Sequence, residues 1–102
     1  NTHIMKHNWT TQDLTNTLNI ILSDYNRKEW SVILTDVSET IGTSKGSVKA
    51  LYTSLKRISQ GHEPNPKKGG VGCNWGQNVE SSYNQWVNDN ELSQSKINII
   101  FS

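Results

Sequence analysis

Apolar residues recur at helical spacing in several stretches of this chain, and polar segments separate the stretches. The apolar positions of the first stretch all fall on one face of a helix: Leu14, Leu18, Ile21, Leu22 and Tyr25. Thr10 and Asp13 precede them with the spacing of a capping box, with Asp in place of the usual Glu. The pattern therefore predicts a first helix from about Thr11 to Tyr25, with Trp9 packed onto Leu14 from the position before the cap.

The next two stretches predict two helices that are joined by a very short turn. The second helix begins at Trp30 and keeps its period to Ile41, where Gly42 supplies a stop. Thr43 or Ser44 then caps a third helix, whose apolar stripe consists of Val48, Leu51, Leu55 and Ile58. A short turn with glycine between two helices is typical of the helix-turn-helix motif of many DNA-binding modules. The same turn is also common in all-α domains that bind no DNA.

The composition changes from Ser59 to Asn74, where both prolines and four of the seven glycines lie. We expect a loop there, because glycine and proline end regular structure. Spacing then predicts a fourth helix from the positions Val79, Tyr83, Trp86 and Val87. The tail fits either a helix or a strand, and we favour a short helix capped by Asn90.

Taken together, these elements predict an all-α fold. We expect residues 1–8 to form a flexible arm and residues 9–102 to form a single helical domain. Within that domain, a three-helix helix-turn-helix core over 9–58 is followed by a Gly/Pro-rich loop over 59–74 and one or two further helices over 75–102. A chain of 102 residues with a mean hydropathy of −0.68 supports one modest core. We expect the large side chains of Trp9, Trp30 and Trp86 to be mostly inside it.

The formal charge of +1 conceals a strong asymmetry along the chain. Residues 42–72 carry a net charge of +5, whereas the rest of the chain carries −4. The basic residues of that segment are Lys45, Lys49, Lys56, Arg57, Lys67 and Lys68, and its only acidic residue is Glu63. Concentrated positive charge of this kind is expected of a protein that approaches phosphate.

The basic residues of the third predicted helix lie beside its apolar stripe. Lys45, Lys49, Tyr52 and Lys56 fall within about 60° of one another at 100° per residue. The helix can then pack through the stripe while it presents three ammonium groups and a phenol to solvent. An ordinary solvated helix can carry three lysines as well. The functional interpretation is a recognition helix in the major groove, with the Lys67-Lys68 loop on the DNA backbone.

The residues that we expect to contact DNA divide into two groups. Phosphate contacts are expected from Lys45, Lys49, Lys56, Arg57, Lys67 and Lys68, and the helix N-terminus at Thr43, Ser44 and Ser47 also attracts phosphate through its free N–H groups. Base contacts are expected from Ser44, Ser47, Lys45 and Tyr52.

Other chemistry finds little support in the sequence. Cys73 is the only cysteine, so an intrachain disulfide and a thiolate zinc site are excluded, and we expect a reducing compartment. His3 and His7 have the spacing of helical metal ligands but lack accompanying ligands. His62 and Glu63 read as exposed loop residues. We therefore expect no enzyme activity, no catalytic residue, no metal and no cofactor.

The chain has no membrane-spanning run of roughly 20 apolar residues and no signal-peptide-like hydrophobic stretch at its start. We expect a cytoplasmic location, or a nuclear one in a eukaryote. The chain begins at Asn1 rather than Met and ends just after INIIF, so we expect it to be part of a longer polypeptide.

A series of landmarks extends over about 90 residues: Trp9-Thr10, Tyr25, Val37-Ser38, Ile41, Gly46-Ser47-Val48-Lys49, Leu55, Ile58, Gly69-Gly70 with Gly72, and Trp86. Their order resembles the N-terminal helical module of many prokaryotic HNH-type restriction-like endonucleases. This chain lacks the His-Asn-His metal motif, the paired CxxC and the carboxylate cluster of those enzymes. The resemblance therefore implies double-stranded DNA recognition without cleavage, with a fused or associated nuclease or other protein as a partner. The three-helix core also resembles Myb or SANT domains, some of which bind histone tails or other proteins.

The main competing hypothesis is a protein-interaction or inhibitor module with no DNA role. An exposed apolar patch that includes Trp75, or pairing of the third helix's lysines with acidic residues of the same chain, would favour it. A hydrolytic enzyme is a third hypothesis, for which we see no convergent set of residues.

Overall fold

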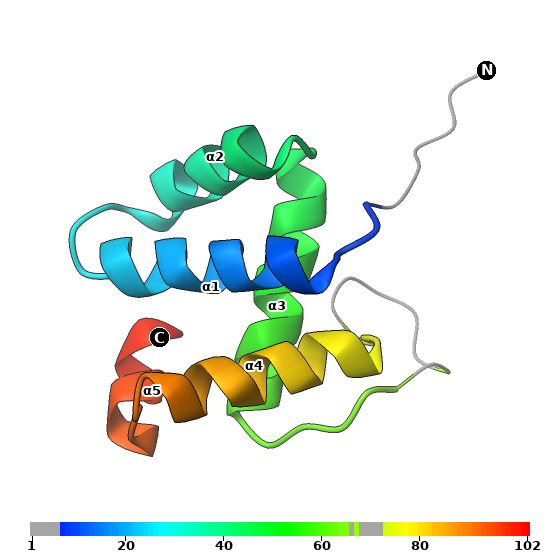
Figure 1. The fold of residues 1–102 in the computed structure, drawn as a ribbon, viewed down its shortest axis with the longest axis vertical. Coiled ribbons are helices and arrows are strands. Elements are labelled where there is room, and N and C mark those ends of the chain that lie inside the picture. Colours follow the sequence, from blue (N-terminus) through cyan, green and yellow to red (C-terminus); the bar gives the residue numbers. More distant parts are fainter. Residues whose placement is uncertain (1–6, 66, 68–72) are drawn as a thin grey trace.

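The computed structural model describes residues 7–65, 67 and 73–102, and these residues contain five α-helices and no strand. The helices, in chain order, are α1 (Thr11–Asp24), α2 (Trp30–Ile41), α3 (Lys45–Ser59), α4 (Gln77–Asp89) and α5 (Gln94–Ile100) (Figure 1). The predicted all-α class is confirmed. None of the helices in these ranges combines the length and the apolar character that a membrane crossing requires.

Side-chain caps define where three of the helices begin. The hydroxyl oxygens of Thr10, Ser44 and Ser93 each accept a hydrogen bond from a backbone N–H three residues later, at 3.1, 3.1 and 3.2 Å. Such bonds satisfy donors that the first helical turn otherwise leaves unpaired. Thr10 caps α1 as predicted, and Ser44 rather than Thr43 caps α3.

The prediction that Asn90 caps the last helix is wrong, because Asn90 belongs to the end of α4. Its side-chain amide donates to the carbonyl oxygen of Trp86 at 2.8 Å, and Ser93 is the N-cap of α5. The Trp86 carbonyl oxygen also accepts from the backbone N–H of Asn90 at 3.1 Å, so both groups of Asn90 bond to the end of α4. Asparagine suits either kind of cap, so the sequence alone did not distinguish them.

Three helices end at a residue in the left-handed backbone region. Gly42 (φ 83°) follows α2 and Gly61 (φ 82°) lies after α3, while Glu91 (φ 50°) occupies the equivalent place after α4. At each end the next N–H bonds back to a carbonyl five residues earlier, for example Leu92 to Val87 at 3.0 Å. This pattern is the Schellman motif, in which glycine is the usual left-handed residue. The predicted stop at Gly42 is confirmed.

The helices pack as two crossing groups around one core. In Figure 1, α1 lies between α2 and α4, and α3 crosses behind them at a steep angle. The core takes residues from every helix: Leu14, Leu18 and Ile21; Ile33 and Val37; Val48, Leu51 and Leu55; Val79, Tyr83 and Trp86; and Ile97 and Ile100, with Trp75 and Phe101 outside the helices. Helices α4 and α5 are therefore part of the same core as the first three.

Aromatic rings gather around Phe101, the second-last residue. Its ring centroid lies 5.9 Å from that of Tyr52, 6.4 Å from Tyr83 and 6.2 Å from Trp86. The Tyr52 ring in turn packs against Trp30 in a tilted arrangement, with 4.1 Å between the ring centroids. This chain of rings joins α2, α3 and α4 through the end of the polypeptide.

The predicted burial of the tryptophans is confirmed. Trp86 is buried, and Trp9 and Trp30 are partly buried and pack against the core. Trp75 is buried at 8% exposure although it follows the predicted loop.

The start of the described chain is anchored at His7. The His7 Nε2 atom lies 2.9 Å from a carboxylate oxygen of Asp13, and the His7 ring packs edge-on against Trp9. Residues 1–6 of the predicted arm lie outside the described residues, and His7, which belongs to the same arm, makes these two contacts. The Asp13 carboxylate contacts His7 in place of the backbone N–H that a full capping box would use.

Candidate nucleic-acid interface

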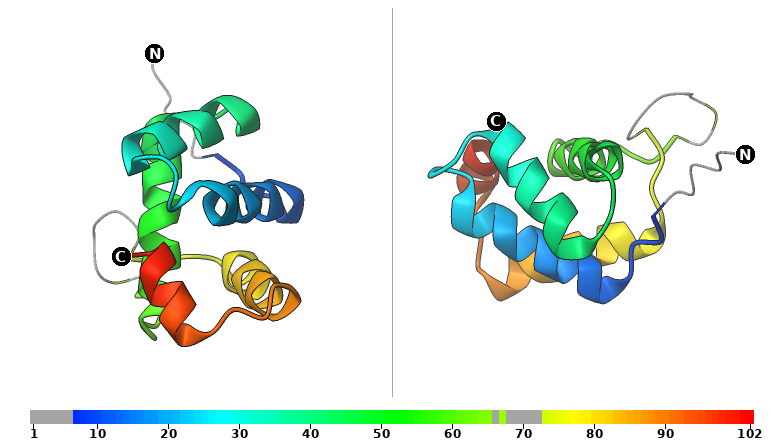
Figure 2. Two further views of the ribbon diagram at one scale, coloured as in Figure 1. Left: turned by 90° about the vertical axis from the view of Figure 1, so that its left-hand side faces the viewer. Right: turned by 90° about the horizontal axis from the view of Figure 1, so that it is seen from above.

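Helix α3 has one face in the core and the opposite face in solvent. Its buried face consists of Val48, Leu51, Ser54, Leu55 and Ser59. Figure 2 shows α1 and α4 together on one side of α3, with no described helix on the opposite side. The buried stripe predicted for this helix is confirmed for Val48, Leu51 and Leu55, whereas Ile58 is half-buried.

The residues predicted to contact DNA divide by exposure. Ser44, Lys45, Lys49 and Lys67 are exposed, and Thr43, Ser47, Tyr52, Lys56 and Arg57 are half-buried. Lys68 lies outside the described residues, as do Gly69, Gly70 and Gly72. The structure thus places Lys45 and Lys49 together on the solvent side of α3, with Lys56 at its edge.

Charge in the four longer helices is segregated by helix. Helix α3 carries Lys45, Lys49, Lys56 and Arg57 and no acidic residue. The charged residues of α1, α2 and α4 are all acidic: Asp13, Asp24, Asp36, Glu39, Glu80 and Asp89. Folding therefore keeps the positive charge on one exposed helix face, which concentrates the electrostatic potential there.

The lysines of α3 are not neutralised by neighbours. Within the described ranges, the ion pairs are His7 with Asp13 and Lys28 with Asp24 and Asp36, and none involves a lysine of α3. Lys28 shows the contrast, since hydrogen bonds to Asp36 and Asp24 raise its pKa above the usual 10.5. Its charge is held between two carboxylates, whereas Lys45 and Lys49 keep theirs available for an external anion.

Hydroxyl groups fix the turn that leads into α3. Ser44 caps the helix and also donates to the Ser47 hydroxyl oxygen at 3.1 Å, while the Ser38 hydroxyl donates to the carbonyl oxygen of Thr43. These bonds hold the end of α2 to the start of α3. Thr43 and Ser44 therefore orient the basic helix, whatever else they contact.

Tyr52 is half-buried, which corrects the expectation that its phenol faces solvent. The ring lies between Trp30 and Phe101, and burial raises the pKa of its hydroxyl group. Tyr52 therefore packs against Trp30 and Phe101. Its predicted base contact stays a prediction.

Arg57 lies at the C-terminal end of α3, where a positive charge favours the helix dipole. Its Nε atom is buried and finds no acceptor among the described residues. No ion pair in the described ranges involves Arg57.

Two hydrogen bonds involve Asn65 in the predicted loop, and one of them joins the two sides of the loop. The N–H of Asn65 donates to the carbonyl oxygen of Cys73 at 2.8 Å, and the N–H of Lys67 donates to the Asn65 side chain at 3.2 Å. The second bond is an Asx turn, which fixes the chain direction just before Lys67. Lys67 is the member of the Lys67-Lys68 pair that can be placed.

Neither feature that would favour a protein-interaction module is present in the described structure. Trp75 is buried, and the lysines of α3 have no acidic partner there. Val32 and Ile99 are the exposed large apolar residues of the described chain, one on α2 and one on α5. In the same ranges, no three His, Cys, Asp or Glu residues gather closely enough to hold a metal ion.

Comparison with known proteins finds no family model, curated protein or solved structure that matches the chain. The resemblance to the module of HNH-type endonucleases, and that to Myb or SANT domains, therefore stay predictions from sequence landmarks.

Proposed function

We propose that this chain is a double-stranded DNA-binding module that docks α3 in a major groove. The observation that carries the proposal is the solvent-facing side of α3, where Lys45 and Lys49 have no ion-pair partner among the described residues. A duplex offers closely spaced phosphates on either side of the groove, and lysines along a helix can reach them.

The dimensions of α3 support this docking. Its 15 residues give a length of about 22 Å at 1.5 Å per residue, and a major groove about 12 Å wide admits a helix. In Figure 1, a short turn joins the end of α2 to the upper end of α3, and two helices joined in this way support the interpretation as a helix-turn-helix motif. The first turn of such a recognition helix lies nearest to the base edges.

We assign the contacts accordingly. Ser44, Lys45 and Ser47, in and before the first turn of α3, are the proposed base contacts. The proposed phosphate contacts are Thr43, through its position beside the helix N-terminus, together with Lys45, Lys49, Lys56, Arg57, Lys67 and Lys68. In this proposal the chain binds DNA and does not cleave it, as the recognition part of a larger protein or system that includes a nuclease or other partner.

The test is a fluorescence-anisotropy titration of a labelled mixed-sequence duplex at about 50 and 200 mM salt. With four to six phosphate contacts, log affinity should fall against log salt with a slope of roughly −4 to −5. The double variant Lys45→Glu with Lys49→Glu should bind too weakly to measure, because it removes two phosphate contacts and adds repulsion. Its helical circular dichroism should be unchanged, because both side chains are exposed.

The matched control is Arg27→Glu with Lys96→Glu, which changes the net charge by the same amount at exposed positions away from α3. It should retain most of the affinity. Equal loss in both double variants would mean that net charge alone drives binding. Full affinity in the α3 variant, or no binding at either salt, would contradict the proposal and direct attention to protein partners.

A further inference from the structure

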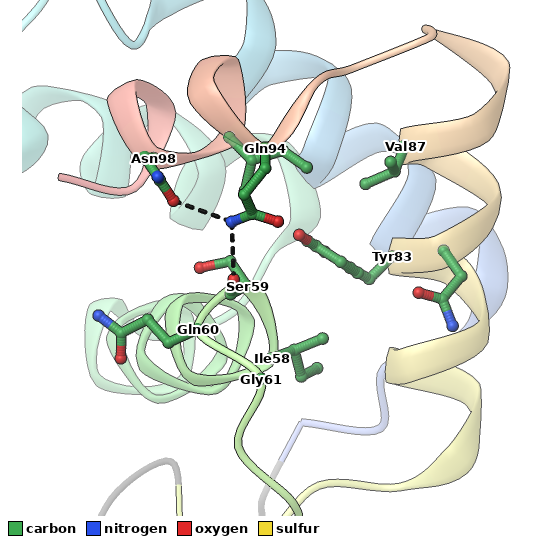
Figure 3. Close-up of a pocket in the computed structure, with 10 residues that line it drawn as sticks. Ile58, Ser59, Gln60, Gly61, Tyr83, Val87, Gln94 and Asn98 are labelled. Carbon is green, nitrogen blue, oxygen red and sulfur yellow. Dashed lines mark hydrogen bonds between the residues drawn. The ribbon is translucent and has the colours of Figure 1, made fainter.

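A cleft of about 660 Å³ lies where the C-terminal end of α3 meets α4 and α5 (Figure 3). One part of its lining is aliphatic, with Ile58 from α3, Val87 from α4 and Ile97 from α5. The polar part includes Tyr83, Gln94 and Asn98. The volume of the cleft is in the range of small-molecule sites. The cleft shares no residue with the solvent side of α3 that carries Lys45 and Lys49, called the lysine face below.

The orientation of the Gln94 amide is determined by its neighbours. Its nitrogen donates to the carbonyl oxygen of Ser59 at 3.1 Å and to the side-chain oxygen of Asn98 at 2.9 Å. A backbone carbonyl can only accept, so the nitrogen of Gln94 has to be the atom that faces Ser59. The Gln94 oxygen is therefore turned the other way and is available as an acceptor.

Figure 3 shows the Gln94 oxygen and the Tyr83 hydroxyl pointing toward one another within the cleft. Tyr83 is largely buried, and this burial raises the pKa of its hydroxyl group, which stays protonated and can donate. Asn98 uses its oxygen to accept from Gln94, so its amide nitrogen is left with free N–H groups. Within the cleft, the Gln94 oxygen is thus an oriented acceptor and the Tyr83 hydroxyl a donor, with aliphatic side chains in the lining beside them.

The lining also limits the class of ligand. Every residue that lines the cleft is uncharged, so neither a phosphate nor a carboxylate nor an ammonium group would find a partner of opposite charge. A suitable ligand is neutral, has a flat apolar face for the aliphatic wall, and has an N–H group for the Gln94 oxygen. Nucleobases meet these requirements, and carboxamides commonly recognise their edges.

We propose that the cleft binds a nucleobase, with a ring or exocyclic N–H directed at the Gln94 oxygen and the base face against Ile58, Val87 and Ile97. The base can belong to a free nucleoside or to an unpaired nucleotide of a nucleic-acid strand. This site is separate from the lysine face, so it does not depend on the function proposed above.

The experiment is an NMR titration of the ¹⁵N-labelled chain with thymidine, cytidine, adenosine and inosine, each to about 10 mM, because one small neutral ligand is expected to bind weakly. At least one nucleoside should shift the signals of Tyr83, Gln94 and Asn98, including the side-chain amides. If thymidine binds, 3-methylthymidine, which lacks the ring N–H, should bind at least about tenfold more weakly. Gln94→Leu and Tyr83→Phe should each weaken binding of the preferred nucleoside. Gln85→Leu, which replaces an exposed glutamine of α4 outside the cleft, should leave that binding unchanged.

Two further titrations distinguish a free nucleoside from an unpaired strand as the ligand, and distinguish this proposal from the proposed DNA binding by α3. A short dT oligonucleotide should perturb the same residues as thymidine if unpaired strands are the source, and only the free nucleoside should do so otherwise. Lys45→Glu with Lys49→Glu should leave nucleoside binding unchanged. The proposal is wrong if no nucleoside shifts the three residues, or if a folded Gln94→Leu variant, checked by its melting curve, binds as the parent chain does.

Discussion

At the residue scale, Glu91 occupies a backbone position that suits glycine. Its φ of 50° lies in the left-handed region, where a Cβ atom costs about 1–2 kcal/mol. The two equivalent helix ends in this chain, after α2 and α3, have Gly42 and Gly61 in the left-handed position. The turn after α4 is therefore held in place by its neighbours, through the hydrogen bonds of Glu91 to Asn88 and of Leu92 to Val87.

Replacement of Glu91 by glycine should stabilise the fold by about 0.5–1 kcal/mol, since relief of backbone strain exceeds the added entropy of the unfolded chain. For a domain of this size the melting temperature should rise by roughly 2–8 °C. Urea unfolding followed by circular dichroism measures the change. Glu91→Ala is the control, because it removes the same charge and keeps the Cβ atom, and equal stability of the two variants would argue against strain.

Two tyrosines make stability depend on pH in the alkaline range. Burial raises the pKa of Tyr52 and of Tyr83 above the usual 10.0 in the folded state. Their stabilising contribution is present below pH 10 and is lost as the pH rises through the folded-state pKa, because the unfolded chain gives up these protons first. The melting temperature of the Tyr52→Phe, Tyr83→Phe double variant should therefore fall less between pH 9 and 11 than that of the parent chain. Thermal scans of both proteins at each pH measure this difference. Parallel curves would show that the two hydroxyl groups are not desolvated.

At the element scale, α5 depends on the core to stay helical. It has only seven residues, and an isolated helix of that length is not stable in water. Ile97, Ile100 and Phe101 attach it to the core, and the Phe101 ring contacts rings from α3 and α4. The cleft depends on the same attachment, because α5 supplies Gln94, Ile97 and Asn98 to its lining.

Phe101→Ala should destabilise the chain by about 3–5 kcal/mol, because it leaves a cavity among aromatic rings that cannot close around it. This is a large share of the 5–15 kcal/mol typical of a whole domain. Chemical unfolding of the variant gives the value. Ile99→Ala, at a neighbouring position that is 59% exposed, should change stability by no more than about 0.5 kcal/mol. Similar effects of the two substitutions would mean that the end of the chain is not anchored by Phe101.

At the scale of the whole molecule, the folded chain separates its charges and its two candidate sites. The charged residues of α3 are all basic, whereas those of α1 and α4, which lie together on one side of α3 in Figure 2, are acidic. The uncharged cleft lies at the other end of α3 from Lys45, between α4 and α5. Charge reversal on α3 and substitution in the cleft are therefore expected to act independently, since neither changes a contact of the other.

Much of the local structure follows from the sequence. The spans of α1 and α2, the cap at Thr10, the stop at Gly42 and the buried positions Val48, Leu51 and Leu55 were all predicted, and the cap of α3 was narrowed to Thr43 or Ser44. Each depends on residues within a few positions of one another, so periodicity and capping rules apply directly. The exposure of Lys45 and Lys49 follows in the same way from their place beside the apolar stripe.

What only the tertiary structure decided depends on residues that are far apart in the chain. Tyr52 turns inward because Trp30 and Phe101 lie on either side of it, and Trp75 is buried because the core extends past the predicted loop. The orientation of the Gln94 amide depends on a carbonyl 35 positions away. The sequence by itself determined which helices form and which faces they bury, because those choices are local. Packing decided which polar groups meet, because partners distant in sequence are brought together only when all five helices share one core.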